Sequence, residues 1–361
     1  MFSPADHAYM SQALQLAEKG LHGTSPNPRV GCVIVHDGRV VGSGWHERAG
    51  QPHAEINALN AAGTAARDAT AYVTLEPCSH HGRTPPCAEA LINAGIAKVV
   101  CAMSDPNPLV AGGGYELLKQ AGIDIQTGLM EGEARALNIG FVARHTRKRP
   151  WVRMKIAASL DGKTALSNGS SQWITSEAAR CDGHRFRARS CAILTGIGTI
   201  LADDPQLTVR HVETSRQPLR VVVDSRLEIP LDAKALRGGG ELIFTAAASE
   251  GKIVALRDVG ARSIVMPDKY DNVDLAGMMR TLADFEINEV MVEAGRKLNG
   301  ALINAGLVDE LVIYFAPYLI GDLAHGMLKL PELTDLADKR ALTIHDLRMV
   351  GPDIRVIARI L

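Results

Sequence analysis

Aromatic side chains are scarce in this chain, whose 361 residues include six phenylalanines, six tyrosines and three tryptophans. That scarcity disfavours a surface built to stack nucleic-acid bases. The chain also lacks a charge excess, because 39 basic residues face 40 acidic ones. A near-zero balance creates no general field that would hold nucleic acid or an anionic membrane, so any anion site must be local.

Long apolar runs are missing as well. Residues 1–6, MFSPAD, lack the basic and apolar regions of a signal peptide, and no apolar run is long enough to span a bilayer. We therefore expect a cytoplasmic protein. In that compartment the six cysteines argue against a disulfide framework, and cysteines that cluster are better candidates for metal binding or catalysis.

The length exceeds the size at which one hydrophobic core usually keeps growing, so two domains are expected. The first part alternates helix and strand patterns, which predicts one sheet covered by helices. Asp37-Gly38 between two apolar runs is a strong hairpin signal. The predicted helices cover residues 3–20, 53–62, 86–93, 115–121 and 131–143, and the strands cover residues 30–35, 39–44, 71–75 and 98–103.

Charge and proline at residues 145–150, HTRKRP, interrupt this pattern. We place the domain boundary there, with domains 1–146 and 147–361. The second domain is predicted to be α/β with its own core. Its expected strands lie at residues 151–157, 191–195, 219–224, 241–245, 263–266, 289–293, 311–316 and near the C-terminus.

The first domain carries a cluster that is typical of catalytic zinc. His53, Cys78 and Cys87 each lie next to a predicted helix start, where the helix dipole stabilises a thiolate. A catalytic zinc takes three protein ligands and leaves a fourth position for water, whose pKa it lowers towards neutrality. Glu55 is too close to His53 to be an easy second ligand, but it is placed to move a proton from that water to a leaving amine. The pattern therefore predicts hydrolytic deamination of an amidine-like carbon in a heterocycle.

Simpler interpretations remain open for these residues. A structural zinc site would close the fourth position with another ligand, and His80 or His81 could supply it. His46 could be a strand-end histidine, and Asn27 could only stabilise a turn. Cys32 and Cys101 lie in apolar strand patterns and are expected to be core residues.

The second domain shows no convincing dinucleotide fingerprint. Gly112-Gly113-Gly114 lies in the first domain and is interpreted as a loop before a helix. Gly196-Ile197-Gly198-Thr199 follows a strand, but a third glycine and an acid after the next strand are not evident in the expected register. Composition alone would not indicate a nicotinamide enzyme.

Longer motifs carry a resemblance that covers nearly the whole chain. In the first domain they are residues 26–31 (PNPRVG), the eight-residue insertion 79–86 between the two cysteines, and residues 104–108 (SDPNP). In the second they are residues 155–163 (KIAASLDGK), 171–175 (SQWIT), 201–210 (LADDPQLTVR) and 293–295 (EAG). Together they resemble the bacterial bifunctional riboflavin-biosynthesis deaminase/reductases.

The resemblance implies a fold and two reactions. The first domain would be a cytidine-deaminase-like α/β/α sandwich, and the second a dihydrofolate-reductase-like α/β domain. Zinc-dependent hydrolytic deamination of 2,5-diamino-6-(5-phosphoribosylamino)pyrimidin-4-one would precede NADPH-dependent reduction of 5-amino-6-(5-phosphoribosylamino)uracil, whose ribosyl group becomes ribityl. A homo-oligomer acting on small molecules, without nucleic-acid or membrane partners, is expected.

Matching motif positions implies individual roles as well. In the deaminase, the base and ribose phosphate would be held by Asn27, His46, His80, Arg83 and Asp105. In the reductase, NADPH would meet Ala157, Trp173, Thr199, Asp203, Ser225 and Gly295. The reductase substrate would meet Ser171, Arg187, Leu207, Arg210 and Glu293. Arg187 and Arg210 could bind its phosphate bidentately. Lys155 or Asp161 would polarise or protonate the opening sugar, and the sequence does not decide between them.

Single residues of the second domain also have simpler interpretations. Arg185, Arg187 and Arg189 could form the exposed basic face of a helix, and Trp173 could be a core aromatic. Glu293 ends an apolar strand at a glycine turn, where α/β proteins often hold ligands.

Two other classes of function stay open from the sequence. One is a zinc nucleobase or RNA deaminase whose second domain recognises the substrate. The other is a zinc-stabilised binding protein without catalytic activity. The first alternative predicts phosphate-driven, salt-dependent RNA binding, and the second predicts that Glu55→Gln changes no measurable turnover.

Overall fold

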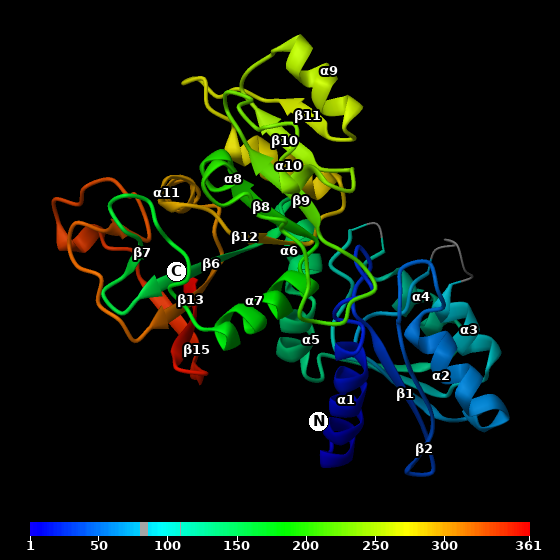
Figure 1. Cartoon of the computed structure of the whole chain (residues 1–361). Helices are drawn as coiled ribbons and strands as arrows, with labels where there is room; N and C mark the ends of the chain where they lie inside the picture. The colour runs from blue at the N-terminus through cyan, green and yellow to red at the C-terminus, as the bar shows by residue number, and fades with distance from the viewer. Residues whose placement is uncertain (80–85, 109) are drawn as a thin grey trace. The chain divides into compact units, whose positions relative to one another are not determined.

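The computed structural model describes residues 1–79, 86–108 and 110–361. The chain forms two compact units, Met1–Lys148 and Arg149–Leu361, each with its own sheet. Figure 1 traces the first unit from blue to teal and the second from green to red. Within the described ranges, none of the helices has the length and apolar character needed to cross a membrane.

The first unit is built on a five-stranded sheet with the order β2-β1-β3-β4-β5. Its strands are β1 (Gly31–His36), β2 (Arg39–Trp45), β3 (Thr70–Val73), β4 (Lys98–Cys101) and β5 (Asp124–Thr127). Its helices are α1 (Pro4–Glu18), α2 (Ala54–Ala62), α3 (Cys87–Asn93), α4 (Gly113–Gln120), α5 (Glu131–Leu137) and α6 (Ile139–Arg147), with a 3-10 turn η1 (Gly63–Ala66). The predicted hairpin is confirmed, because β1 and β2 pair antiparallel and Asp37 and Gly38 take positive φ at the turn.

Helices pack on both faces of this sheet at glycine positions. A Cβ added to Gly31 would lie 2.0 Å from the carbonyl oxygen of Ala13 in α1. The next residue, Cys32, pairs with Gly44, where an added Cβ would lie 2.8 Å from the carbonyl oxygen of Ala54 in α2. Because neighbouring residues of a strand point to opposite faces, α1 and α2 cover opposite faces. The predicted α/β/α sandwich is therefore confirmed for this unit.

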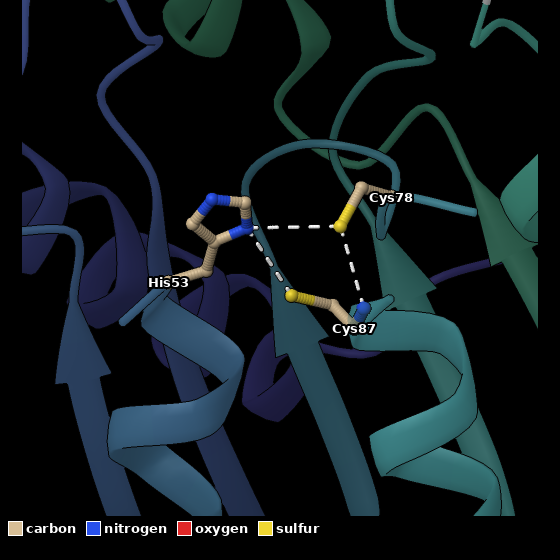
Figure 2. Close-up of side chains that lie close together, drawn as sticks. All are labelled: His53, Cys78 and Cys87. Carbon is tan, nitrogen blue, oxygen red and sulfur yellow. Dashed lines mark hydrogen bonds between the residues drawn. The ribbon is translucent and has the colours of Figure 1, made fainter. Parts of the chain in front are cut away.

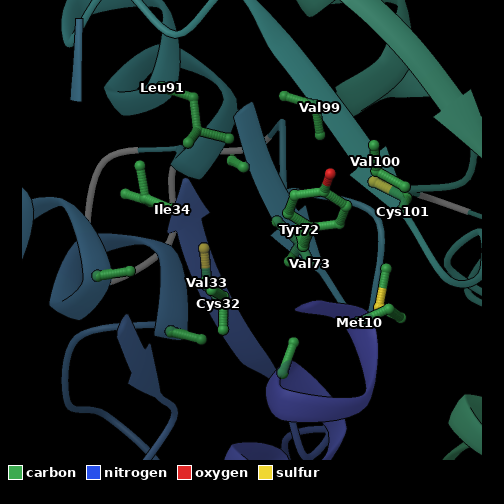
Figure 3. Packing of buried hydrophobic residues seen from close by; sticks show 14 of the residues in the cluster. Met10, Cys32, Val33, Ile34, Tyr72, Val73, Leu91, Val99, Val100 and Cys101 are labelled. Atoms are coloured by element: carbon green, nitrogen blue, oxygen red, sulfur yellow. The ribbon is translucent and has the colours of Figure 1, made fainter. Parts of the chain in front are cut away.

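Small and branched apolar side chains fill the core between the layers (Figure 3). Cys32 and Cys101 are both fully buried in it, beside Val73 and Ile34. Burial raises the pKa of both thiols, which keeps them protonated and unreactive. The interpretation of these two cysteines as core residues is confirmed.

The predicted helix 131–143 is broken in the structure, and Asn138 explains the break. Its buried side chain accepts a hydrogen bond from the backbone N–H of Arg29 at 2.8 Å and donates one to the carbonyl oxygen of Arg29 at 2.9 Å. This amide therefore occupies both backbone groups of a residue far away in sequence, which a helical periodicity cannot reveal. As a result, α5 ends at Leu137 and α6 begins at Ile139.

The second unit is built on a nine-stranded sheet with the order β11-β10-β9-β8-β12-β6-β13-β16-β15, and β7 and β14 form a separate pair. Its strands are β6 (Trp151–Ser159), β7 (Lys163–Ala165), β8 (Ala192–Gly196), β9 (Leu219–Val223), β10 (Leu242–Thr245), β11 (Arg262–Val265), β12 (Glu289–Val292), β13 (Glu310–Ala316), β14 (His325–Gly326), β15 (Leu342–Val350) and β16 (Asp353–Ile360). Its helices are α7 (Glu177–Arg189), α8 (Ile197–Asp203), α9 (Glu250–Asp258), α10 (Leu275–Asp284) and α11 (Arg296–Asn304), with 3-10 turns η2 (Lys234–Leu236) and η3 (Leu336–Asp338).

The two faces of the central strand β6 differ in polarity. Met154 and Ile156 belong to the main apolar core, to which α10 and α11 also contribute buried side chains. Arg153 and Lys155 alternate with them and point to the other face, where Arg153 bonds to Glu289 and Glu310. This charged face is where α7 packs, and α7 contributes Arg189 to the same network through Glu289.

Every strand predicted from the sequence corresponds to a strand here, whereas β5, β7 and β14 were not predicted. β5 has the sequence DIQT and is largely exposed, and β7 and β14 are only three and two residues long. Such short or polar segments lack the apolar run that predicts a strand.

Candidate active sites

The three predicted zinc ligands of the first unit come together (Figure 2). His53 caps the N-terminus of α2, Cys87 is the first residue of α3, and Cys78 lies in the segment that follows β3. Their ligand atoms all lie within 4.8 Å of one another. Helices begin next to His53 and at Cys87, as the sequence predicts, whereas in the described residues no helix begins next to Cys78, so that part of the prediction is wrong.

The spacing of these atoms fits tetrahedral zinc. His53 Nδ1 lies 3.6 Å from Cys78 Sγ and 3.3 Å from Cys87 Sγ. Zinc–nitrogen and zinc–sulfur bonds at a tetrahedral angle place such atoms about 3.6 Å apart. The donor set of one imidazole and two thiols also suits zinc by softness.

The surroundings of Cys78 favour the thiolate that zinc requires. A hydrogen bond from the Cys87 thiol, together with His53 and the Cys87 backbone N–H at 3.3 Å, outweighs burial and lowers the pKa of Cys78 to about 4. The pKa of Cys87 is raised in turn, first because its thiol donates to Cys78 and then because it is buried. In the metal-free cluster one thiolate is stabilised, and the second proton must leave when a metal binds.

Glu55, the second residue of α2, is buried beside the ligands without being one of them. Burial, assisted by the charge of Cys78, raises its pKa to about 7, against the opposing effects of His53 and a hydrogen bond with Cys87. A carboxyl group with a pKa near neutrality can both accept and return a proton.

His46 and Asn27 form the layer behind His53. The His46 ring meets the His53 ring edge-to-face with centroids 5.1 Å apart. Its Nδ1 donates to the carbonyl oxygen of Pro52 at 3.1 Å, so its Nε2 accepts from the Asn27 amide at 3.1 Å. Burial lowers the pKa of His46, which keeps the ring neutral. His46 is thus buried, and Asn27 is the half-buried member of the pair.

Glu76 is a residue of this site to which the sequence gave no role. Its buried carboxylate accepts the backbone N–H of Asp105 and that of Gly114, each at 3.1 Å. It therefore ties the predicted substrate-binding segment at Asp105 to the start of α4. The only signal in the sequence was an acid directly before Pro77-Cys78. His80 and Arg83, the other predicted substrate residues, lie outside the described residues.

In the second unit, Gly295 and Thr199 meet at the ends of two neighbouring parallel strands, β12 and β8. Gly295 caps the N-terminus of α11, and a Cβ added to it would meet only Thr199 Oγ1, at 3.9 Å. The backbone N–H groups at this helix end are therefore approachable, which suits a phosphate group.

The other predicted cofactor residues lie on nearby loops and strands. Trp173 is 70% exposed, and the Arg180 guanidinium lies 4.5 Å from its ring centroid, so the interpretation as a core aromatic is wrong. Asp203 ends α8 and accepts a hydrogen bond from the Gln172 side chain at 3.1 Å. Ser225 follows β9 and its hydroxyl accepts the Val273 N–H at 3.3 Å, while Ala157 is a half-buried residue of β6.

Arg187 and Glu293 form a two-pronged ion pair, with Nε–Oε1 and Nη2–Oε2 distances of 2.5 and 2.9 Å. The third donor of Arg187, Nη1, binds the carbonyl oxygen of Thr208 at 2.8 Å. Burial alone would raise the pKa of Glu293, but the charge of Arg187 lowers it to about 2. Since its fork is taken by Glu293, Arg187 is not arranged for the bidentate phosphate contact that we predicted. It does not lie on an exposed basic face either, whereas Arg185 does.

Arg210 is the exposed cation of this region, and its Nη1 bonds only weakly to Gln206 and Thr208, each at 3.2 Å. Leu207 is buried and has a positive φ of 52°. Ser171 is half-buried in the loop that precedes α7. The structure therefore brings Arg187, Glu293 and the segment 207–210 together.

The two candidates for the reductase proton donor have different surroundings. Val292 pairs with Met154, so the next step of the register places Glu293 beside Lys155. Burial and the charge of Arg187 lower the pKa of Lys155, against the opposing effect of Glu293. Asp161 instead accepts hydrogen bonds from Ser159 Oγ and from the backbone N–H groups of residues 320 and 321. These bonds, led by the one from Ser159, lower the pKa of Asp161 to about 2.

Comparison with known proteins matches both units. Residues 3–103 match the family model of the cytidine and deoxycytidylate deaminase zinc-binding region, and residues 150–355 match the RibD C-terminal domain. The riboflavin biosynthesis protein RibD of Escherichia coli strain K12 is 49% identical over 361 residues, covering 97% of this chain and 98% of that protein. Its counterpart in Haemophilus influenzae is 45% identical over 367 residues, covering 98% and 97%.

Solved structures agree over the whole length. The RibD of Acinetobacter baumannii superimposes with a TM-score of 0.92 at 43% identity, covering 99% of each chain. A diaminohydroxyphosphoribosylaminopyrimidine deaminase/5-amino-6-(5-phosphoribosylamino)uracil reductase of Thermotoga maritima gives 0.87 at 32% identity, also covering 99% of each chain.

Proposed function

This chain belongs to the family of the riboflavin biosynthesis protein RibD, and we propose that it catalyses two successive reactions. The first unit deaminates 2,5-diamino-6-(5-phosphoribosylamino)pyrimidin-4-one by hydrolysis. The second reduces the ribosyl group of 5-amino-6-(5-phosphoribosylamino)uracil to ribityl with NADPH. The observation that carries the proposal is that Glu55 lies beside a cluster of zinc-type ligands. The chain that holds this cluster also aligns along nearly its whole length with RibD proteins.

The deaminase step is assigned to four residues. His53, Cys78 and Cys87 hold the zinc, which supplies a polarised water near neutral pH when bound. Glu55 accepts a proton from the attacking water and returns it to the departing amino group, which leaves as ammonia. Its burial beside the ligands, which raises its pKa, supports a role as a proton carrier.

The deaminase substrate is assigned to the residues around this cluster. The half-buried Asn27 reaches the pyrimidine, and the buried His46 holds the Asn27 amide in place. Asp105, which Glu76 fixes through its backbone, contacts the ribose side. By family resemblance His80 and Arg83 complete the set, Arg83 with a guanidinium suited to phosphate.

The reductase step is assigned to the charged face of β6 and β12. NADPH supplies the hydride. Its phosphates are bound at the start of α11 near Gly295 and Thr199, and its other contacts are Ala157, Trp173, Asp203 and Ser225. Lys155 donates the proton to the opening sugar, since its lowered pKa makes it a better acid than an ordinary lysine. Asp161 cannot donate one at working pH, because its carboxyl is ionised and held by the 320–321 backbone.

The substrate of the reductase is assigned to Ser171, Leu207, Arg210 and the Arg187–Glu293 pair. The exposed Arg210 meets the phosphate. The largely buried ion pair holds the Arg187 and Glu293 side chains in fixed orientations, in which their polar groups contact the pyrimidine and the sugar.

We also propose a homo-oligomer in the cytoplasm. β15 is the last strand of the nine-stranded sheet and exposes Ile344, Leu347 and Met349. An edge strand with several exposed apolar side chains is usually covered, and a second copy of the chain is the proposed cover. NADPH and sugar phosphates are intracellular metabolites, and a net charge of −1 offers no field for nucleic acid.

The alternative of a nucleobase or RNA deaminase with a recognition domain is set aside. Residues 150–355 match the RibD C-terminal domain, which is the reductase part of these proteins and not a module that recognises a nucleic acid.

The deaminase assignment is tested with Glu55→Gln. We expect ammonia release to fall by about 100-fold or more, because the proton carrier is lost while the ligands stay. Zinc content by elemental analysis and NADPH oxidation with the pre-deaminated uracil should be unchanged. Glu89→Gln is the matched control, since Glu89 follows Cys87 by two residues just as Glu55 follows His53. Equal activity of the two variants would overturn the role of Glu55.

A further inference from the structure

The segment 207–210 of the second unit lies outside the strands, yet side chains bind its backbone from α7. Arg187 Nη1 donates to the carbonyl oxygen of Thr208 at 2.8 Å. One helical turn earlier, His184 Nδ1 accepts the backbone N–H of Arg210 at 3.1 Å. Two neighbouring side chains of one helix thus take alternate backbone groups of the segment, as a neighbouring strand would.

A third side chain, that of Gln217 just before β9, binds the residue between these two contacts. The backbone N–H of Val209 donates to Gln217 Oε1 at 2.8 Å, and the Gln217 amide donates to the Val209 carbonyl oxygen at 3.2 Å. The segment is therefore held along both edges. Its backbone is bound by two side chains of α7 and by Gln217.

The hydrogen bond to Arg210 fixes the chemical state of His184. A backbone N–H can only donate, so Nδ1 must carry a free lone pair and the ring proton must lie on Nε2. The ring is buried, and the groups that face it are Arg187 of its own helix, Arg210 of the segment, His211 next to the segment, and Glu293 at the end of β12. Burial first, and then the three neighbouring cationic or titratable groups, lower the pKa of His184 to about 4 against the effect of Glu293.

We propose that His184 is a positioning residue of the reductase, whose neutral ring holds the Arg210 backbone so that the Arg210 side chain stands ready for the substrate phosphate. The proposal rests on the proposed function, in which Arg210 binds that phosphate. His184 itself does not touch the substrate in this account. It acts through the 207–210 backbone and shares that task with Arg187, which also orients Glu293.

This role predicts a specific kinetic signature. Loss of the acceptor leaves the Arg210 N–H without a partner, and the segment then samples conformations in which Arg210 is misplaced. Substrate binding weakens in proportion to the lost population, whereas hydride transfer from correctly bound complexes proceeds as before. NADPH binding, which uses other loops, is unaffected.

The test compares His184→Leu, His184→Asn and His211→Asn in the full-length chain. We expect His184→Leu to raise the KM for the phosphoribosylaminouracil about tenfold, with kcat and the KM for NADPH little changed. His184→Asn should restore most of the affinity, because Asn Oδ1 can replace Nδ1 as acceptor. His211→Asn, which alters the neighbouring ring of the pair, should behave as wild type. An unchanged kcat and an unchanged KM for NADPH verify that the second unit, Arg149–Leu361, is folded in each variant.

Amide hydrogen exchange provides a readout that needs no substrate. In His184→Leu the Arg210 amide should exchange at least tenfold faster than in wild type, while in His184→Asn it should stay protected. Unchanged exchange at Arg210, or an equal rise in both KM values, would overturn the positioning role. If wild type oxidises no NADPH with the uracil substrate, the proposed function fails instead, and the exchange rates still decide whether His184 holds the segment.

Discussion

At the scale of single residues, the reductase site depends on which of two polar groups can carry a proton. Lys155 lies among charged neighbours on the face of β6 that meets α7, where its pKa is lowered. Asp161 lies in an exposed turn, and its carboxylate oxygens accept hydrogen bonds from Ser159 and from the backbone of residues 320–321. The first arrangement suits proton transfer, and the second suits the fixing of a loop.

This difference predicts that two substitutions reduce the reductase kcat to very different extents. Lys155→Met should lower the reductase kcat by about 100-fold, because the proton donor is removed from an otherwise intact site. Asp161→Asn keeps the size of the side chain and some of its acceptor capacity, so kcat should stay within about threefold of wild type. The measurement is NADPH oxidation with the pre-deaminated uracil at saturating substrate. A larger loss of kcat in Asp161→Asn than in Lys155→Met would reverse the assignment.

The residues of the zinc cluster could be predicted from the sequence more directly than those of the reductase site. His53, Cys78 and Cys87 could be predicted because their residue types specify a metal and because His53 and Cys87 lie at helix starts that the local sequence indicates. The Arg187–Glu293 pair joins residues 106 positions apart and has no local signature, so a resemblance was needed to single them out. Even that resemblance did not indicate that Glu293 would occupy the fork of Arg187.

At the scale of elements, the packing of α2 on β2 determines where His53, the N-cap of α2, and Glu55, its second residue, are placed. α2 approaches the strand closely at Gly42 and Gly44, where an added Cβ would lie 2.3 Å and 2.8 Å from backbone oxygens of the helix. Such backbone contacts cannot be relieved by a side-chain rotation. The placement of Glu55 therefore depends on these two glycines of β2.

We predict that Gly44→Ala shifts α2 away from β2. The stability of the first unit should fall by about 1–3 kcal/mol, with a concurrent loss of ammonia release and zinc affinity. Gly132→Ala in α5 is the control, because an added Cβ there meets no atom within 4 Å. That substitution should leave activity unchanged and raise stability by about 0.5 kcal/mol. Calorimetry of the zinc-loaded chain measures the stability, and a Gly44→Ala variant as stable as wild type would contradict the account.

Most elements could be predicted from periodicity and end signals, and α1 is an example. Its predicted start is confirmed, and Ser3 and Asp6 form reciprocal capping hydrogen bonds there. The break between α5 and α6 could not be predicted, because it results from the long-range bonds of Asn138 with Arg29. Tertiary contacts of this kind override local pattern.

At the scale of the whole molecule, the residues that we propose for each reaction belong to one of the two compact units. The zinc-type cluster and Glu55 belong to Met1–Lys148, and the Arg187–Glu293 pair, Lys155 and Gly295 belong to Arg149–Leu361. Joining successive enzymes in one chain keeps the intermediate near its next site at a raised local concentration. Since the residues proposed for each reaction lie within one unit, we predict that each activity survives loss of the other.

Removal of the metal tests this central claim most directly. We would strip the chain with a chelator, verify the loss of zinc by elemental analysis, and assay both reactions with their own substrates. The account predicts that ammonia release disappears and returns when zinc is added back, while NADPH oxidation with the pre-deaminated uracil continues at the wild-type rate. Ammonia release that survives complete metal removal, or an equal loss of both activities, would contradict it.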